Sequence, residues 1–183
     1  LGAGFRSALV RDREAIVTLT DGSRLATRLV VGADGRDSAV REAAGFGVSL
    51  TRYGQRALAF TVTHPEPHGA VSTEIYNRGG AFTLVPMADR DGTHASAVVW
   101  MEDGPRAAEL AALAAAALGA EATTRSGAVL GPLAVASPVG SWPVVTQVAT
   151  DLTAPRTALM AEAAHVLPPI GAQGLNTSLA DVA

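Results

Sequence analysis

The sequence predicts an α/β fold into which a separate, mostly antiparallel sheet is inserted. Near each end of the chain a short apolar strand leads into a glycine-containing turn and a helix, at residues 29–44 and 157–183. Between them, from residue 56 to 100, apolar and polar residues alternate as in antiparallel strands with one buried face. We therefore expect residues 1–50 and 151–183 to form one domain and residues 51–150 to form the inserted sheet domain.

The first 50 residues predict a strand pair and a short helix. The expected elements are strands at residues 9–20 and 25–31 and a helix at residues 38–44. Asp21-Gly22 is a hairpin turn signal between the strands. Residues 29–31 are continuously apolar and predict a strand end buried on both faces. Gly45 is placed to end the helix.

The rest of the chain predicts more strands and two helices. The expected strands lie at residues 57–63, 71–76, 81–86, 95–101, 139–150 and 157–160, and the expected helices at residues 105–118 and 176–183. Pro105 falls in the first turn of its helix, after the capping pair Glu102-Asp103, and Gly119 is placed to end it.

Composition excludes several classes of protein. The 183 residues carry a net charge of -3 without charge blocks, which argues against nucleic acid as the main partner. All 14 basic residues are arginine, so a phosphate-binding or Schiff-base lysine is excluded. Cysteine is absent, which excludes disulfides, thiolate catalysis and cysteine-bound metals. No apolar run is long enough to span a membrane, so we expect a cytoplasmic protein.

Residues 32–41, Gly-Ala-Asp-Gly-Arg-Asp-Ser-Ala-Val-Arg, combine a strand end, two glycines and a helix start. Glycines let a ligand approach the backbone, and N–H groups at a helix start bind phosphate. We expect Asp34 to accept a hydrogen bond from a hydroxyl or to hold the loop through N–H donors. Arg41 is expected to pair with Asp34 or with phosphate. An ordinary turn capped by aspartate explains this segment equally well.

Residues 164–176, Ala-His-Val-Leu-Pro-Pro-Ile-Gly-Ala-Gln-Gly-Leu-Asn, form a second segment of this kind. Pro168-Pro169 forces extended backbone, and small and polar residues follow before a helix. Such a loop can lay its N–H groups against a flat polar ring, and the helix dipole would stabilise negative charge there. The alternative is a proline and glycine loop that caps a helix.

Together these segments resemble the FAD-binding elements of flavoprotein aromatic hydroxylases, the p-hydroxybenzoate hydroxylase-like family. Residues 32–41 are similar to the family's Asp-Gly motif, and residues 161–183 to its second FAD motif. In the second motif the matching residues are His165, Pro168, Gln173, Gly174, Leu175, Asn176 and Asp181. Residues 53–57, Tyr-Gly-Gln-Arg-Ala, resemble the segment that opens the substrate sheet in the ubiquinone-biosynthesis branch.

The resemblance implies part of a Rossmann-like FAD-binding domain with an inserted substrate sheet. It implies a monooxygenase that hydroxylates an aromatic ring with FAD, NAD(P)H and O2 and needs no nucleophilic side chain. The implied FAD contacts are Asp34, Gly35, Arg41, Glu162, Pro168, Gly171, Gln173, Gly174, Leu175 and Asn176. Tyr53 and Gln55 are implied on the substrate side.

A polyprenylated phenol of ubiquinone biosynthesis is the implied substrate, with association at the periphery of the inner membrane or with a protein complex. Another phenolic or polyketide aromatic is the alternative. A hypothesis from a different functional class is that the chain is not an enzyme but a non-catalytic substrate-domain fragment or a binding module.

The sequence departs from the family pattern at three positions and in one missing motif. Ala161-Glu162 stands where the family has Gly-Asp, and Ala172 stands where it has Gly. The Gly-x-Gly-x-x-Gly motif that binds pyrophosphate is not found, because Gly2-Ala3-Gly4 follows no strand and Ser7 takes the third glycine position. We therefore expect this chain to be the middle of a longer enzyme and to hold FAD weakly by itself.

The remaining polar and aromatic residues predict no further site. His64 and His68 flank a proline-rich stretch without a third ligand at metal spacing, so we expect a surface loop there. Trp100 and Trp142 are expected to pack in the core.

Overall fold

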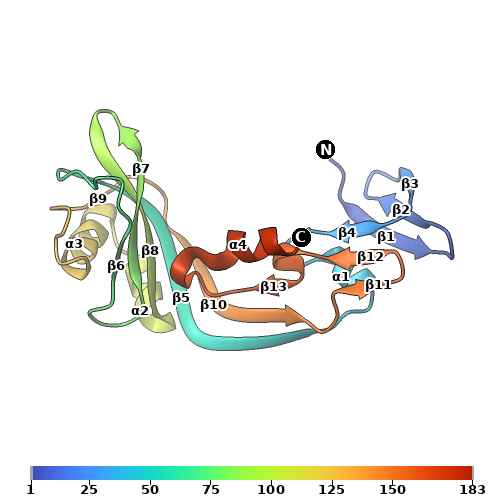
Figure 1. Cartoon of the computed structure of the whole chain (residues 1–183). Coiled ribbons are helices and arrows are strands. Elements are labelled where there is room, and N and C mark those ends of the chain that lie inside the picture. Colours follow the sequence, from blue (N-terminus) through green and yellow to red (C-terminus); the bar gives the residue numbers. More distant parts are fainter. Residues whose placement is uncertain (1, 183) are drawn as a thin grey trace. The chain divides into compact units, whose positions relative to one another are not determined.

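The computed structural model describes residues 2–182 and divides the chain into compact units (Figure 1). Leu1–Thr51 and Val145–Ala183 form the first unit, and Arg52–Val144 form the second. Two strands, β5 (Val48–His64) and β10 (Gly140–Ala149), carry the chain between the units. The sequence predicted a middle domain at residues 51–150, whereas the second unit covers Arg52–Val144. The functional role of each domain stays a prediction.

The first unit is built from short strands and helices. In chain order they are β1 (Phe5–Val10), β2 (Ala15–Leu19), β3 (Arg24–Thr27), β4 (Val30–Gly32), α1 (Ala39–Ala43), β11 (Thr153–Ala154), β12 (Thr157–Leu159), η1 (Ala161–Ala163), β13 (His165–Val166), η2 (Ile170–Ala172) and α4 (Gln173–Ala180). One antiparallel sheet has the order β1-β2-β3, and a second has the order β11-β12-β4 with β12 parallel to β4. Strand β13 pairs with the end of β10.

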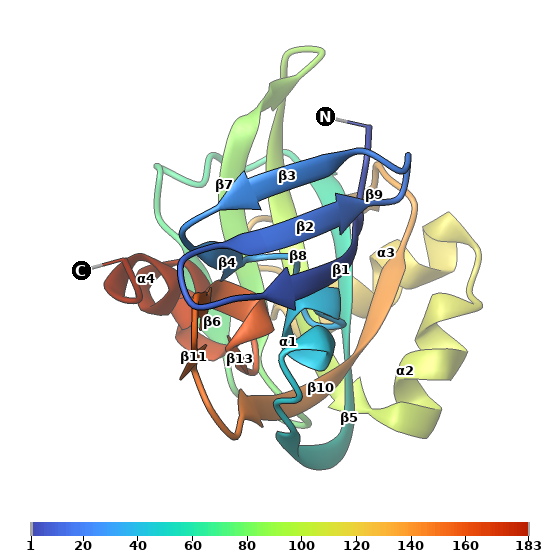
Figure 2. The same cartoon turned by 90° about the vertical axis from the view of Figure 1, so that its right-hand side faces the viewer.

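The core of the first unit lies where α1 packs against β1 and β4 (Figure 2). Val17, Val40 and Leu159 are among its buried residues. Gly32 ends β4 beneath the helix, and a Cβ there would lie 2.7 Å from the Leu159 side chain and 3.0 Å from Val40. Glycine is therefore what allows α1 to approach the parallel strand pair.

Two strand predictions in the first unit are wrong. Residues 9–20 form two strands, because the chain turns at residues 11–14, where the Arg11 N–H donates to the Glu14 carbonyl at 2.8 Å. Residues 25–31 are divided between β3 and β4, which belong to different sheets. Leu29 and Val31 are 52% and 49% exposed rather than buried, because only one face of β4 packs against the core.

Other local predictions for this unit are confirmed. The turn at Asp21-Gly22 joins β2 to β3, and Gly22 has the positive φ of 86° that the turn requires. Helix α1 begins after its N-cap Ser38, and Gly45, at φ 77°, follows it. Strand β12 lies within the predicted residues 157–160, and α4 begins three residues before the predicted position 176, at Gln173.

The second unit is an antiparallel sheet with two helices on one side (Figure 1). Its elements besides β5 and β10 are β6 (Thr73–Ile75), β7 (Phe82–Arg90), β8 (Thr93–Asp103), α2 (Gly104–Ala111), α3 (Ala115–Arg125) and β9 (Ala134–Val135). The strand order is β10-β5-β8-β7-β6, and β9 pairs with β5. Side chains from this sheet and from α2 and α3 share one core, in which Phe82 and Trp100 stack edge to face at 5.2 Å. The predicted mixed α/β fold with an antiparallel middle sheet is confirmed.

The predicted single helix over residues 105–118 is wrong. The structure has α2 and α3 instead, separated by residues 112–114. Gly119 lies inside α3 because the helix passes close to the Leu133 carbonyl oxygen, which would be 2.6 Å from a Cβ at this position. The alanine-rich sequence gave no signal for the break. Asp103 occupies the N-cap position of α2, but its side chain makes no capping hydrogen bond.

Two further side-chain predictions in this unit are wrong. Trp142 is 52% exposed, whereas Trp100 is buried as expected. His64 ends β5 and is 2% exposed, because its ring nitrogens bond the Glu66 carbonyl at 2.8 Å and the Ser96 hydroxyl at 2.9 Å. Within residues 2–182 no helix is long and apolar enough to cross a membrane, and no cluster of His, Asp and Glu side chains is arranged to hold a metal ion.

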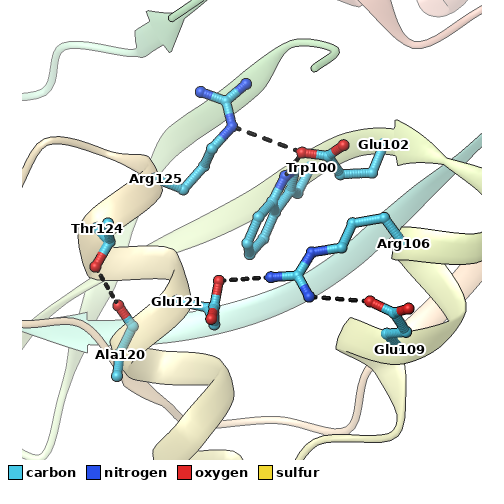
Figure 3. A network of polar contacts seen from close by, with 8 residues as sticks. All are labelled: Trp100, Glu102, Arg106, Glu109, Ala120, Glu121, Thr124 and Arg125. Atoms are coloured by element: carbon cyan, nitrogen blue, oxygen red, sulfur yellow. Dashed lines mark hydrogen bonds and ion pairs between the residues drawn. The ribbon is translucent and has the colours of Figure 1, made fainter. Parts of the chain in front are cut away.

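A buried arginine ties α3 to the sheet (Figure 3). Arg125 donates its terminal nitrogens to the Asn77 side-chain oxygen and the Gly80 carbonyl, and its Nε lies 4.0 Å from Glu102 Oε1. Burial lowers the pKa of Arg125, and the nearby charge of Glu102 opposes that shift. The neighbouring Arg106 is instead solvent-exposed and pairs with Glu109 and Glu121 at 3.1 and 2.8 Å.

Candidate functional site

The candidate site begins at the carboxyl ends of the parallel strands β4 and β12. Gly32 pairs with Leu159, and the Met160 N–H donates to the Gly32 carbonyl at 3.0 Å. From these adjacent positions the chain enters the loop of Asp34 on one side and η1 on the other. The carboxyl edge of parallel strands is where open α/β sheets bind ligands, so these segments are well placed for one.

Asp34 holds the loop that leads into α1. One carboxylate oxygen accepts a hydrogen bond from the Ser38 hydroxyl, and the other accepts one from the Val40 N–H at 3.1 Å. Partial burial alone would raise the pKa of Asp34, but these hydrogen bonds outweigh it and lower the pKa below its ordinary value. Gly35 follows at φ 87°, a conformation that suits glycine. Asp34 thus holds its own loop through Ser38 and Val40, and its role in binding a ligand stays a prediction.

Arg41 links α1 to η1 rather than pairing with Asp34. Its Nη1 donates to the Ala163 carbonyl at 3.0 Å. The Asp34 loop has a second support from β10, where the buried Gln147 donates its Nε2 to the Arg36 carbonyl at 3.0 Å. These contacts fix the two segments at the carboxyl edge relative to each other.

The pair Ala161-Glu162 opens η1 in an unusual backbone conformation. Ala161 has φ 54°, in the left-handed region that favours glycine, at the position where the resembling family has glycine. Glu162 is exposed, and its carboxylate makes no hydrogen bond or ion pair with residues 2–182. Both Asp34 oxygens are engaged, whereas Glu162 offers a free carboxylate beside this edge.

Asp181 follows α4 near the end of the second motif and contacts residues at the start of that motif. Its Oδ2 accepts hydrogen bonds from the Ala161 N–H and from His165 Nε2, both at 2.7 Å. The sequence singled out His165 and Asp181 only as family matches, and the structure shows that they contact each other.

The loop before α4 has the predicted glycine turn. Gly171 has φ 67°, and its carbonyl accepts a hydrogen bond from Gln173 Nε2 at 3.0 Å. Gly174 has open space where a Cβ would point, Asn176 is exposed and Leu175 is 70% exposed, while Pro168 is half-buried. The first N–H groups of an α-helix have no partner within that helix, so the start of α4 can supply donors to an acceptor. That this loop borders the same ligand as Asp34 stays a prediction.

Tyr53 and Gln55 belong to the second unit, on β5. Gln55 is half-buried opposite Asp103 of β8, and Tyr53 is 50% exposed. Their assignment to a substrate is a prediction that no contact in the chain tests.

Sequence reasoning missed two residues that shape the site, Ser38 and Gln147. Ser38 is the N-cap of α1 and also binds Asp34, and a serine three residues before Arg41 at a helix start is a recognisable capping signal. Gln147 carried no such signal, because only its burial in a strand next to the Asp34 loop reveals its role.

A parallel strand edge, a capped loop after it and a glycine turn before a helix are features of nucleotide-binding domains of the α/β class. Residues 7–183 match the model of the FAD binding domain family. The chain therefore belongs to the FAD binding domain family.

Curated relatives and solved structures match most of this chain. It is 39% identical over 178 residues to the ubiquinone hydroxylase UbiL of Rhodospirillum rubrum, which covers 97% of this chain and 41% of that protein. It is 30% identical over 167 residues to 3-demethoxyubiquinol 3-hydroxylase of Escherichia coli, and the match covers 90% of this chain and 41% of that protein. The structure of PqsL, a probable FAD-dependent monooxygenase from Pseudomonas aeruginosa, matches with a TM-score of 0.75 and 22% identity, covering 97% of this chain and 50% of that one. The chain thus spans about two fifths of the length of these curated relatives.

The described residues fit FAD as a ligand. Glu162 offers free carboxylate oxygens to ribityl or ribose hydroxyls, which need acceptors. The N-terminal turn of α4 and the open backbone at Gly174 suit a flat ring that carries negative charge. Ala161 adds a Cβ where a glycine would leave the backbone open to the cofactor. Its left-handed φ shows that the backbone still makes the turn that glycine favours.

Proposed function

We propose that this chain is the cofactor-binding and substrate-sheet part of an FAD-dependent monooxygenase that hydroxylates an aromatic ring in ubiquinone biosynthesis. The observation that carries the proposal is the pairing of an FAD-family site at the carboxyl edge of β4 and β12 with an antiparallel sheet domain. Similarity to ubiquinone hydroxylases over nearly all of the chain supports it.

The proposed reaction uses NAD(P)H, O2 and a polyprenylated phenol. When bound, FAD supplies the redox chemistry that activates O2 for ring hydroxylation. Glu162 accepts hydrogen bonds from the cofactor's hydroxyls, and the N–H groups at the start of α4 stabilise negative charge on its ring. Asp34 and Arg41 act indirectly, because they hold the loop and η1 in place. No nucleophilic side chain is required.

The substrate also supports a proposed location. A polyprenyl tail is lipid-soluble, so we place the enzyme in the cytoplasm at the periphery of the inner membrane. Another phenolic or polyketide aromatic is the second candidate substrate. It is favoured by the exposed aromatic side chains of Trp142 and Tyr53, each of which could stack on an aromatic ring without requiring a lipid tail.

The test uses the complete protein that carries this chain, reconstituted with FAD. A phenol with a short polyprenyl tail and the same phenol without the tail are supplied with O2 and either NADH or NADPH. We expect mass spectrometry to show one added oxygen on the prenylated phenol, together with oxidation of the nicotinamide. Equal or better hydroxylation of the tail-free phenol would favour the second candidate. Flavin binding without any oxygenated product would contradict both.

A further inference from the structure

We propose that Asp181 is a positioning residue that aims Glu162 at the cofactor, an inference that rests on the proposed function. A single oxygen of Asp181, Oδ2, holds two groups from different elements. It accepts the Ala161 N–H and the His165 Nε2–H, each at 2.7 Å. The side chains of His165 and Asp181 are 15% and 21% exposed, so most of each side chain is covered although Asp181 lies at the surface.

The first bond acts on a backbone that needs outside support. Ala161 lies at φ 54°, and a residue with a Cβ keeps such a conformation only when its surroundings impose it. The Asp181 carboxylate binds the amide of this same residue. The turn is closed further by the Ala164 N–H, which donates to the Ala161 carbonyl at 2.9 Å.

The second bond anchors the carboxylate to the sheet. His165 lies in β13 and pairs with Val148 of β10, so its backbone is fixed by the ladder. Because a carboxylate only accepts hydrogen bonds, the proton of His165 is on Nε2. Asp181 therefore connects the end of α4 to a fixed strand and to the turn of η1.

Glu162 lies between two residues that are both held. On one side Asp181 binds the Ala161 N–H, and on the other the Ala163 carbonyl accepts from Arg41 at 3.0 Å. The Glu162 carboxylate itself makes no hydrogen bond or ion pair within the described chain. The backbone on each side thus fixes the direction of a side chain that has no other partner, and Asp181 controls one of the two sides.

The experiment measures FAD affinity in the complete apoprotein by the change in flavin fluorescence on binding. Asp181→Ala is expected to weaken binding about tenfold or more, the scale of one lost charge-assisted hydrogen bond. Asp181→Asn keeps an acceptor oxygen and guards against misfolding of the alanine variant, and we expect it to restore most of the affinity. Asp151→Ala is the matched control, since Asp151 is exposed and within residues 2–182 accepts a hydrogen bond only from the Thr150 hydroxyl, and we expect this variant to bind FAD as the wild type does.

A double-mutant cycle separates positioning from general structural support. If Asp181 acts through Glu162, then Asp181→Ala should weaken binding far less in a Glu162→Gln background than in the wild type. Additive losses in the two backgrounds would overturn the proposal. So would FAD affinity that is unchanged in Asp181→Ala while the wild type binds normally. A wild-type protein that binds no FAD would overturn the proposed function, and this role of Asp181 with it.

Discussion

At the scale of single residues, Ala161 holds a backbone conformation that glycine adopts more readily. Replacing it with glycine removes the left-handed penalty of about 1–2 kcal/mol but makes the unfolded chain more flexible, which costs about 0.5–1 kcal/mol. We therefore expect Ala161→Gly to raise the free energy of unfolding by up to about 1 kcal/mol, measured by urea denaturation. Ala163→Gly is the control, because Ala163 is buried in η1 without a positive φ, and it should destabilise the protein.

Arg125 and Arg106 lie in the same network but should differ widely in their contribution to stability. The Arg125 side chain is 0% exposed, and its removal takes the positive charge from Glu102 and the donors from the Asn77 side-chain oxygen and the Gly80 carbonyl. We expect Arg125→Ala to lower the free energy of unfolding by about 3–5 kcal/mol. Arg106→Ala breaks two exposed ion pairs and should cost at most about 1 kcal/mol. Equal losses in thermal or urea unfolding would contradict this account of Figure 3.

At the scale of elements, two helical glycines should respond in opposite ways to alanine. A Cβ at Gly119 in α3 would lie 2.6 Å from the Leu133 carbonyl, so Gly119→Ala should cost about 1–3 kcal/mol through overpacking. Gly174 in α4 has open space in the Cβ direction, so Gly174→Ala should stabilise the helix by about 1 kcal/mol. Urea denaturation of the two variants gives the comparison. Stabilisation by Gly119→Ala would show that α3 can move away from Leu133.

The ends of β5 and β8 form a histidine cluster that should make the second unit sensitive to acid. The rings of His64, His68 and His94 lie 6.0–6.2 Å apart, and Asp89 pairs with His94. Burial, followed by repulsion from the other two histidines, lowers the pKa of His64 below its ordinary 6.5, while the Glu66 carbonyl and Asp89 oppose the shift.

The lowered pKa fixes the direction of the pH effect. Below about pH 6.5 the unfolded chain binds a proton at His64 that the folded chain resists. Stability should therefore fall as the pH decreases from about 6.5 through the lower folded-state pKa and level off beneath it. Urea unfolding between about pH 5 and 8 measures this, and His64→Gln should flatten the dependence. An unchanged slope in that variant would assign the effect to other groups.

The elements that could be predicted from sequence are those whose ends carry their own chemical signals. Ser38 and Gly45 bound α1, and Asp21-Gly22 marks a hairpin, because caps and turns act over three or four residues. The break between α2 and α3 could not be predicted, since the alanine-rich sequence continues through residues 112–114 without a glycine or proline. The turn at residues 11–14 was missed because charged residues, without glycine or proline, form it.

The candidate site also depends on contacts that could not be predicted from sequence, because they join positions far apart in the chain. Its candidate residues were proposed from motifs, but the contacts of Asp181 with Ala161 and His165 link positions 16 to 20 residues apart. The support of the Asp34 loop by Gln147 spans 111 residues. No local pattern encodes such pairs, because folding alone brings them together.

At the scale of the whole molecule, FAD should affect the two units differently. If the cofactor binds at the carboxyl edge of β4 and β12, backbone amides of η1 and the start of α4 should exchange hydrogen more slowly in its presence. The amides of α2 and α3, which pack on the sheet of the second unit, should exchange at unchanged rates. Hydrogen exchange followed by mass spectrometry tests this in the complete protein. Protection confined to residues 104–125 would place the ligand elsewhere.

The division of the first unit between both ends of the sequence has a consequence for synthesis on the ribosome. Val30 and Val31 of β4 pair with Thr157 and Ala158 of β12, so β4 lacks this neighbour until more than a hundred further residues have been made. The second unit, Arg52–Val144, is continuous and emerges in one piece. At roughly 5–20 residues per second, nascent β4 waits several seconds with an open edge. The inserted sheet can therefore fold before β4 meets β12.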